Sequence, residues 1–213
     1  MTAETVERAR GQIRAARKAP PAPSWRPPVL ADFLRGQRVL VFDATLSHCG
    51  WALLEVLDRV VVHGKGTISP VTSQVGYLGT WDKARMLQER LAPILRWAAY
   101  DFGPGMPRTK TVVEAPSVGG GSRTESSLIA GMLVWMTSPE DCAAVSATHV
   151  SAVLLGDSRV RSTERKKRIR EAVIALVLEA AGRNWNEHER DALATGLTHL
   201  YDIRQGSETG ELA

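Results

Sequence analysis

Three apolar runs follow one another closely in the first third of the chain. They are "RVLVFDATL" (38–46), "GWALLEVL" (50–57) and "RVVVHGKGTIS" (59–69), and their Val, Leu and Ile residues favour strands. Only the short turn segments "SHCG" and "DR" separate these runs. The spacing predicts three antiparallel strands joined by tight turns.

The spacing of apolar residues then changes from that of a strand to that of a helix. Thr80 is a candidate N-cap, and Pro93 lies inside the pattern that follows it, so we expect a helix over 80–100 with a kink. The residues at helical spacing are Leu87, Leu91, Ile94 and Ala98.

Strand and helix patterns alternate over the rest of the chain. Strands are predicted at 111–117 and 142–150, with a helix at 124–137 between them, and two helices follow, at 163–182 and from residue 186. Three hairpin strands followed by this alternation predict an α/β fold with a mixed five-stranded sheet flanked by helices.

Basic residues gather in two segments. Residues 1–40 carry eight Lys/Arg against three acids, and "SRVRSTERKKRIR" (158–170) carries seven against one, although the net charge of the whole chain is only +4. Two basic segments on an otherwise acidic protein favour a polyanion such as nucleic acid as the partner. We expect residues 1–37, which include the Pro-rich "APPAPSWRPP", to form an extended basic arm, 38–205 one domain, and 206–213 a flexible tail.

Composition excludes several classes of protein. No apolar run is long enough to span a bilayer, and the N-terminus lacks the order of a secretory signal, so we expect a cytoplasmic protein without a membrane partner. Cys49 and Cys142 show no metal-ligand spacing, and both are predicted to be buried as small apolar residues.

Three acids stand at positions that suit a metal site. Asp43 ends the first predicted strand, Glu114 ends the fourth, and Asp191 lies on the last helix. Burying a lone carboxylate costs several kcal/mol unless it is paired or bound to a cation. Magnesium prefers such oxygen ligands, and a pair of ions supports phosphodiester cleavage, so the pattern favours a divalent-metal site.

The segment "NEHERDALATGL" (186–197) places chemistry and packing on different faces of one helix. His188 and Asp191 are three positions apart and share a face, with Glu187 beside them as a candidate auxiliary ligand. Glu189 points toward the apolar side, so we do not expect it to be a ligand. The apolar side is the ridge Leu193, Leu197 and Leu200.

Taken together, "VLVFDATLSHCGWALLEV", "VVEAPS" and "HERDALATGL" resemble the RuvC family of Holliday-junction resolvases, which have the RNase H-like fold. The similarity spans residues 38–202, and the terminal H-x-x-D-A-L-A is its most specific part. It implies catalytic and metal-binding roles for four residues, which are Asp43, Glu114, His188 and Asp191. We expect Asp43 to bridge two Mg²⁺ or Mn²⁺ ions, and His188 to bind one of them weakly or to act on the attacking water.

The resemblance also implies a homodimer that binds a four-way DNA junction and nicks two strands symmetrically. The DNA-binding candidates are Ser117, Arg123, Arg165, Lys166, Lys167 and Arg170. Ser117 stands where many bacterial members have an aromatic residue, a departure that bears on how the junction is distorted. The small size and the added arm favour a phage-encoded member.

Three other functions share part of this pattern. Another RNase H-like nuclease acting on flap, branched or duplex DNA would have the same acids, and a non-catalytic DNA-binding module could keep the fold. An actin-like phosphotransferase would need Gly-rich phosphate loops in both halves of a longer chain, and these are absent from the sequence.

Overall fold

The computed structural model describes residues 34–45, 47–69, 79–100, 108–115, 123–137, 141–182 and 184–209. Its elements in chain order are β1 (Arg38–Ala44), β2 (Cys49–Val56), β3 (Val60–Ile68), α3 (Thr80–Tyr100), β4 (Lys110–Ala115), α4 (Arg123–Met136), β5 (Cys142–Ser146), α5 (Ala147–Leu155), α6 (Ser162–Leu176), the 3₁₀ turn η2 (Leu178–Ala181) and α7 (Glu187–Thr209). No helix in these ranges combines the length and the apolar character needed to cross a membrane.

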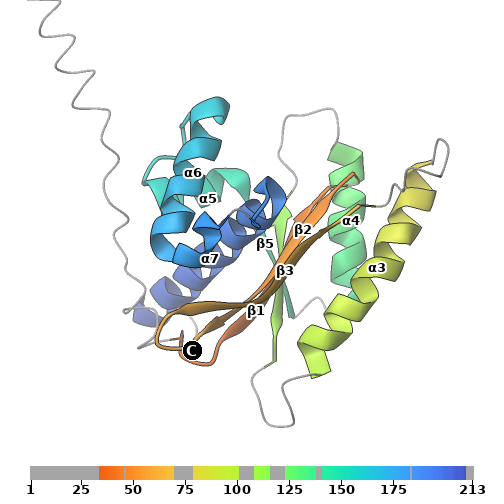
Figure 1. The fold of residues 1–213 in the computed structure, drawn as a ribbon, viewed down its shortest axis with the longest axis horizontal. Coiled ribbons are helices and arrows are strands. Elements are labelled where there is room, and N and C mark those ends of the chain that lie inside the picture. The colour runs from red at the N-terminus through yellow and green to blue at the C-terminus, as the bar shows by residue number, and fades with distance from the viewer. Residues whose placement is uncertain are drawn as a thin grey trace, which may run out of the picture.

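The strands form one mixed sheet in the order β3-β2-β1-β4-β5. The β1–β2 and β2–β3 pairs are antiparallel, whereas the β1–β4 and β4–β5 pairs are parallel. The predicted fold class is therefore confirmed. Helices α3 and α4 cover one face of the sheet, and α5, α6 and α7 cover the other (Figure 1).

Alternation along β1 divides the core into two clusters. Val39 and Val41 pack toward α7, while Leu40 and Phe42 pack toward α3 and α4. This follows from the two-residue period of a strand, which sends successive side chains to opposite faces of the sheet.

Small residues bring α7 very close to the sheet. A Cβ on Gly196 would lie 2.6 Å from both Leu54 Cδ1 and Val41 Cγ2. The predicted apolar ridge of this helix is confirmed, since all its leucines are fully buried. The helix is thereby held across β1 and β2, with its N-terminus over the ends of those strands (Figure 1).

The prediction of a strand over 142–150 was wrong in its second half. The strand ends at Ser146, whose Oγ accepts a hydrogen bond from His149 N at 3.2 Å and caps α5. The β-branched residues that follow therefore belong to a helix. The helix predicted over 163–182 ends earlier than expected, at Leu176, and the separate 3₁₀ turn η2 follows it.

The borders of the domain and the cysteines also differ in detail from the expectations. Leu34, the first described residue, is buried in the same core cluster as the leucines of α7, and α7 itself runs to Thr209. Most of the expected arm, residues 1–33, lies outside the described residues. Cys49 is buried as predicted, whereas Cys142 is only half-buried.

Candidate active site

Two neighbouring strands bring Asp43 and Glu114 together. Phe42 pairs with Val113 in the parallel β1–β4 register, so the acids that follow them lie side by side. Both follow the alternation that points to the α7 face of the sheet. Asp43 is only 8% exposed, and Glu114 is partly buried.

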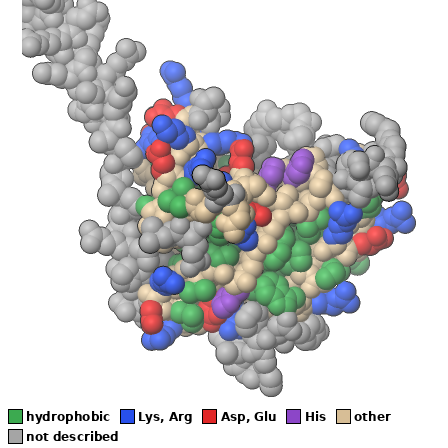
Figure 2. Space-filling model, viewed as in Figure 1, with side chains coloured by type: hydrophobic (Ala, Val, Ile, Leu, Met, Phe, Trp, Pro, Cys, Tyr) green, Lys and Arg blue, Asp and Glu red, His purple; other side chains and the backbone are tan. Residues whose placement is uncertain are grey.

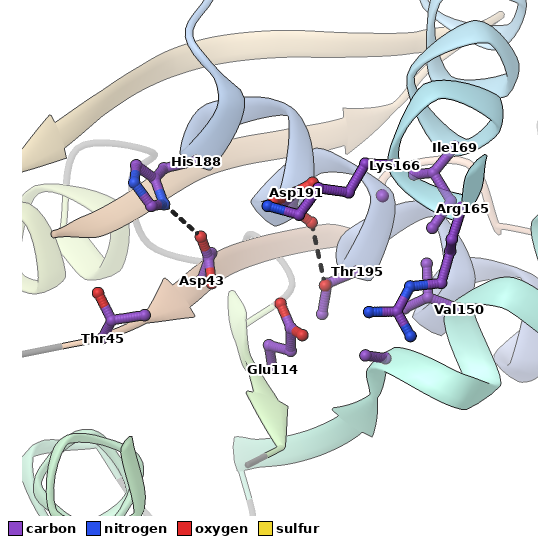
Figure 3. Close-up of a pocket in the computed structure, with 12 residues that line it drawn as sticks. Asp43, Thr45, Glu114, Val150, Arg165, Lys166, Ile169, His188, Asp191 and Thr195 are labelled. Carbon is purple, nitrogen blue, oxygen red and sulfur yellow. Dashed lines mark hydrogen bonds and ion pairs between the residues drawn. The ribbon is translucent and has the colours of Figure 1, made fainter. Parts of the chain in front are cut away.

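The first turns of α7 supply the other two predicted residues. His188 Nδ1 donates to Asp43 Oδ2 at 2.8 Å, with the carboxylate as the acceptor. Asp191 lies one turn further along the same helical face, as its spacing predicted. Figure 3 shows the side chains of Asp43, Glu114 and Asp191 directed toward one another from β1, β4 and α7.

A cap fixes where α7 begins. Asn186 Oδ1 accepts from Glu189 N at 3.0 Å, and Glu189 Oε2 accepts from Asn186 N at 3.0 Å, which is the reciprocal pattern of a capping box. Lys65 on β3 donates to the same Glu189 oxygen at 2.8 Å and lies over the Trp185 ring. Glu189 therefore anchors the helix and is turned away from the acids, as its angle predicted.

The four predicted residues line one cavity of about 220 Å³ (Figure 3). Its other polar walls are Thr45, which follows β1, Thr195 on α7, and Arg165 and Lys166 on α6. Four segments that are distant in the sequence thus converge on a single space.

Burial and nearby negative charges raise the pKa values of two carboxyl groups in this cavity, Glu114 and Asp191. Burial is the largest cause that raises the pKa of Glu114 to about 8, and the charges of Asp43 and Asp191 add to it, while Arg165 opposes it. Burial and then Asp43 raise the pKa of Asp191 to about 6. The hydrogen bond to Asp43 raises the pKa of His188 above its ordinary value.

This donor set fits a hard divalent cation. Among the described residues, no three His, Cys, Asp or Glu side chains already have their donor atoms gathered around a point that could hold an ion. The cavity nevertheless brings together the carboxyl groups of Asp43, Glu114 and Asp191. The pKa values of Glu114 and Asp191 are raised by burial and by the neighbouring acids, so this space favours added positive charge. A cation with a preference for oxygen ligands, such as Mg²⁺ or Mn²⁺, would supply that charge.

Comparison with known proteins finds matches among solved structures. No protein-family model matches the chain, and no curated protein sequence matches it significantly. RuvC from Thermus thermophilus matches with a TM-score of 0.61 at 15% identity, over 80% of this chain and 97% of that one.

The chain has the fold of RuvC.

Two further solved structures were compared. T. thermophilus RuvC in complex with a Holliday junction substrate gives a TM-score of 0.59 at 15% identity, over the same shares of the two chains. The yeast mitochondrial Holliday junction resolvase Ydc2 gives 0.49 at 12% identity, over 83% of this chain and 86% of that one.

A second cavity adjoins the acidic one in this RuvC fold. It measures about 260 Å³ and shares Lys166, Ile169 and Asp191 with the first. Its remaining walls are Lys167, Arg170, Glu187 and Arg190. Figure 2 shows Lys and Arg side chains over the region of α6, in the upper left of the view. The acidic cavity, which suits a metal ion, therefore lies next to a basic cavity lined by Lys and Arg side chains.

Four of the six predicted DNA-binding residues line the two cavities. Arg165 and Lys166 line the acidic cavity, and Lys166 also lines the basic cavity together with Lys167 and Arg170. Arg123 opens α4, but its side chain is not among those described, and Ser117 lies outside the described residues.

Glu187, the candidate auxiliary ligand, pairs with Lys166 and does not line the acidic cavity. This ion pair is the first cause of the lowered pKa of Glu187 and of the raised pKa of Lys166. The shared helical face was predicted correctly, but α6 lies close enough to place a cation on that carboxylate.

Sequence reasoning missed several residues that shape the site. The ring of His48 stacks on that of His188, and Arg190 joins the basic cavity while it donates to the carbonyls of Ala180 and Gly182. Lys65 and Glu189 are 124 positions apart, so only the folded chain reveals their pairing. The turn "SHCG" contained the one local signal, a histidine beside a candidate metal-site strand.

Proposed function

We propose that this protein is a metal-dependent endonuclease that resolves four-way DNA junctions by paired, symmetric hydrolysis of two phosphodiester bonds. The observation that carries the proposal is the convergence of Asp43, Glu114, His188 and Asp191 on one cavity within a RuvC fold. A structural match at 15% sequence identity shows the fold alone. The proposed activity therefore rests on the chemistry of the cavity. A phage-encoded source stays a prediction.

The chain's own carboxylates would hold the metal. Asp43, Glu114 and Asp191 would hold two Mg²⁺ or Mn²⁺ ions, with Asp43 shared between them and Glu114 and Asp191 each serving one. When bound, the ions would stabilise the negative charge that builds on the phosphate oxygens during cleavage. The deprotonated carboxylates are therefore the form of the protein that acts.

His188 is suited to accept a proton from the attacking water. Because Asp43 holds Nδ1, the second ring nitrogen, Nε2, remains for the substrate side. The carboxylate also stabilises the imidazolium that forms when Nε2 takes the proton, as the raised pKa of His188 indicates. This geometry favours the role of a base over that of a metal ligand.

The basic cavity would bind the DNA backbone beside the bond that is cut. Lys167 and Arg170 lie on an ordered helix, and Arg190 is held by two backbone carbonyls, so their charges need little reorganisation. Burial and then the nearby Arg170 lower the pKa of Arg190, so the cationic groups repel one another. A phosphate in this cavity would relieve that repulsion.

Two symmetric nicks require two active sites, which a homodimer would provide. The outer surface of α3 and α4 carries an apolar groove of about 650 Å³. Trp81 and Trp135 border this groove, and each is 76% exposed. Exposed tryptophans of this kind are typical of interfaces between proteins, which supports the proposal of a dimer.

The experiment that tests this function compares DNA substrates. Labelled four-way junctions, flaps and linear duplexes would be incubated with the protein in Mg²⁺, Mn²⁺ or EDTA. Paired symmetric nicks confined to junctions, and lost in EDTA, are expected. Equal cutting of linear duplex would instead indicate a general RNase H-like nuclease, and binding without cutting would indicate a DNA-binding module.

A further inference from the structure

A second histidine lies against the site, on the turn between β1 and β2. The rings of His48 and His188 are nearly parallel, with an interplanar angle of 6° and centroids 5.1 Å apart. His48 lines neither the acidic nor the basic cavity. It therefore touches the site through His188.

The turn that carries His48 is tightly fixed. Thr45 Oγ1 donates to the carbonyl of His48 at 2.5 Å and accepts from His48 N at 3.0 Å. Thr45 N also donates to that carbonyl, at 3.2 Å. Ser69, just after β3, donates its hydroxyl to the carbonyl of Ser47 at 3.1 Å. The turn is thus tied to itself and to a neighbouring strand.

Within the described part of the chain, the ring of His188 has one hydrogen bond that orients it. The bond from Nδ1 to Asp43 fixes one ring atom, but the ring can still rotate about the line of that bond. About a third of the side chain is exposed, so the packing around it is incomplete. A flat neighbour against one face of the ring removes the remaining freedom, because stacked rings resist tilting.

We propose that His48 is a positioning residue, whose stacked ring fixes the plane of His188 and thereby the direction in which Nε2 points. This inference rests on the proposed function, since it assigns a purpose to an oriented Nε2. The flat ring is the part of His48 that does this, and its nitrogens are not required.

Three variants separate the ring from its nitrogens. His48→Ala removes the ring, His48→Phe keeps a flat ring without nitrogens, and His149→Ala is the matched control, because His149 pairs with Asp202 on the α5 side of α7. Single-turnover junction cleavage, junction affinity in EDTA, and the melting temperature would be measured for each. His48→Ala should slow cleavage about 10-fold with unchanged affinity and melting temperature, whereas His48→Phe should restore most of the rate and His149→Ala should have no effect.

A double-mutant cycle with His188→Ala tests whether the effect passes through His188. In that background, His48→Ala should cause no further loss. An equal loss in both backgrounds, or a His48→Phe variant as slow as His48→Ala, would overturn the inference, as would a wild-type rate for His48→Ala.

The imidazole NMR signals of His188 in metal-free protein give a readout without cleavage. They should shift and broaden in His48→Ala and return toward wild type in His48→Phe. Unchanged signals in His48→Ala would overturn the inference even if the protein cuts no junction. Absence of cleavage by the wild-type protein, with the expected NMR change, would contradict the proposed function and leave the positioning of His188 supported.

Discussion

Gly50 lies directly against the backbone of His188. A Cβ at Gly50 would meet the carbonyl group of His188 and lie 2.7 Å from its Cβ. Gly50 is also the residue that pairs with Asp43 across β1 and β2. Gly50 therefore pairs with the strand position of Asp43 and also sets how closely α7, which carries His188 and Asp191, approaches the sheet.

Replacing Gly50 by alanine should displace the start of α7. The added methyl group cannot be accommodated by a flexible side chain, since it meets backbone, so we expect a loss of about 1–3 kcal/mol in the free energy of unfolding and loss of cleavage. Denaturant unfolding measures the first effect. Gly131→Ala on α4 is the control: its Cβ would meet nothing within 4 Å, so this variant should be unchanged or more stable.

Weakening the cap of α7 should reduce both stability and activity. Asn186→Ala removes the side-chain acceptor for Glu189 N, which we expect to cost about 1 kcal/mol. Lys65→Met removes the cation that holds Glu189 and should lower cleavage by a similar route. If both variants unfold like wild type, the capping box does not anchor the helix.

Stability without metal should fall as the pH rises. Glu114 and Asp191 have pKa values of about 8 and about 6 in the folded protein, whereas the unfolded chain has ordinary values near 4. The folded state therefore binds more protons between these values, and its advantage over the unfolded state declines as the pH rises through 6 toward 8. Denaturant unfolding in EDTA at pH 5 and pH 8 measures this decline.

Glu114→Gln supplies the control for this pH effect. The neutral amide should make the metal-free protein more stable than wild type at pH 8 but not at pH 5. Added Mg²⁺ should raise the melting temperature of wild type more at pH 8 than at pH 6, because the ligands must lose their protons to bind it. The same difference between variant and wild type at both pH values would contradict the assignment.

Neutralising the basic cavity should weaken DNA binding without affecting the acids. Arg170→Gln should raise the dissociation constant for junctions in EDTA and reduce the slope of log K against log salt by about 0.9. Arg159→Gln, which removes an exposed cation of the same basic segment outside the cavity, is the matched control. Equal effects of the two variants would indicate only a general attraction between charges.

Much of the fold could be predicted because its signals are local. The apolar run that begins at Arg38 and the helical spacing of Leu193 and Leu197 each depend on neighbours within a few residues. The strand and the buried leucine ridge that they predict were both confirmed. Helix α5 was missed because its β-branched residues continue the strand pattern of β5. The hydroxyl of Ser146 caps the helix and so decides where the strand ends.

The site was less predictable because its contacts join distant segments. The shared face of His188 and Asp191 follows from helix geometry alone. The pairing of Lys166 with Glu187 depends on how α6 packs against α7, and the stacking of His48 depends on the height of α7 above β2. Neither packing distance is encoded in a spacing along the chain.

The central claim is that the acidic cavity cleaves DNA, and Asp191→Asn tests it most directly. This change keeps the size of the side chain but removes a carboxylate that supports metal binding. Junction cleavage in Mg²⁺ and junction affinity in EDTA would be measured side by side for variant and wild type. We predict that cleavage is abolished while the affinity is retained; a variant that cuts at the full wild-type rate would contradict the account.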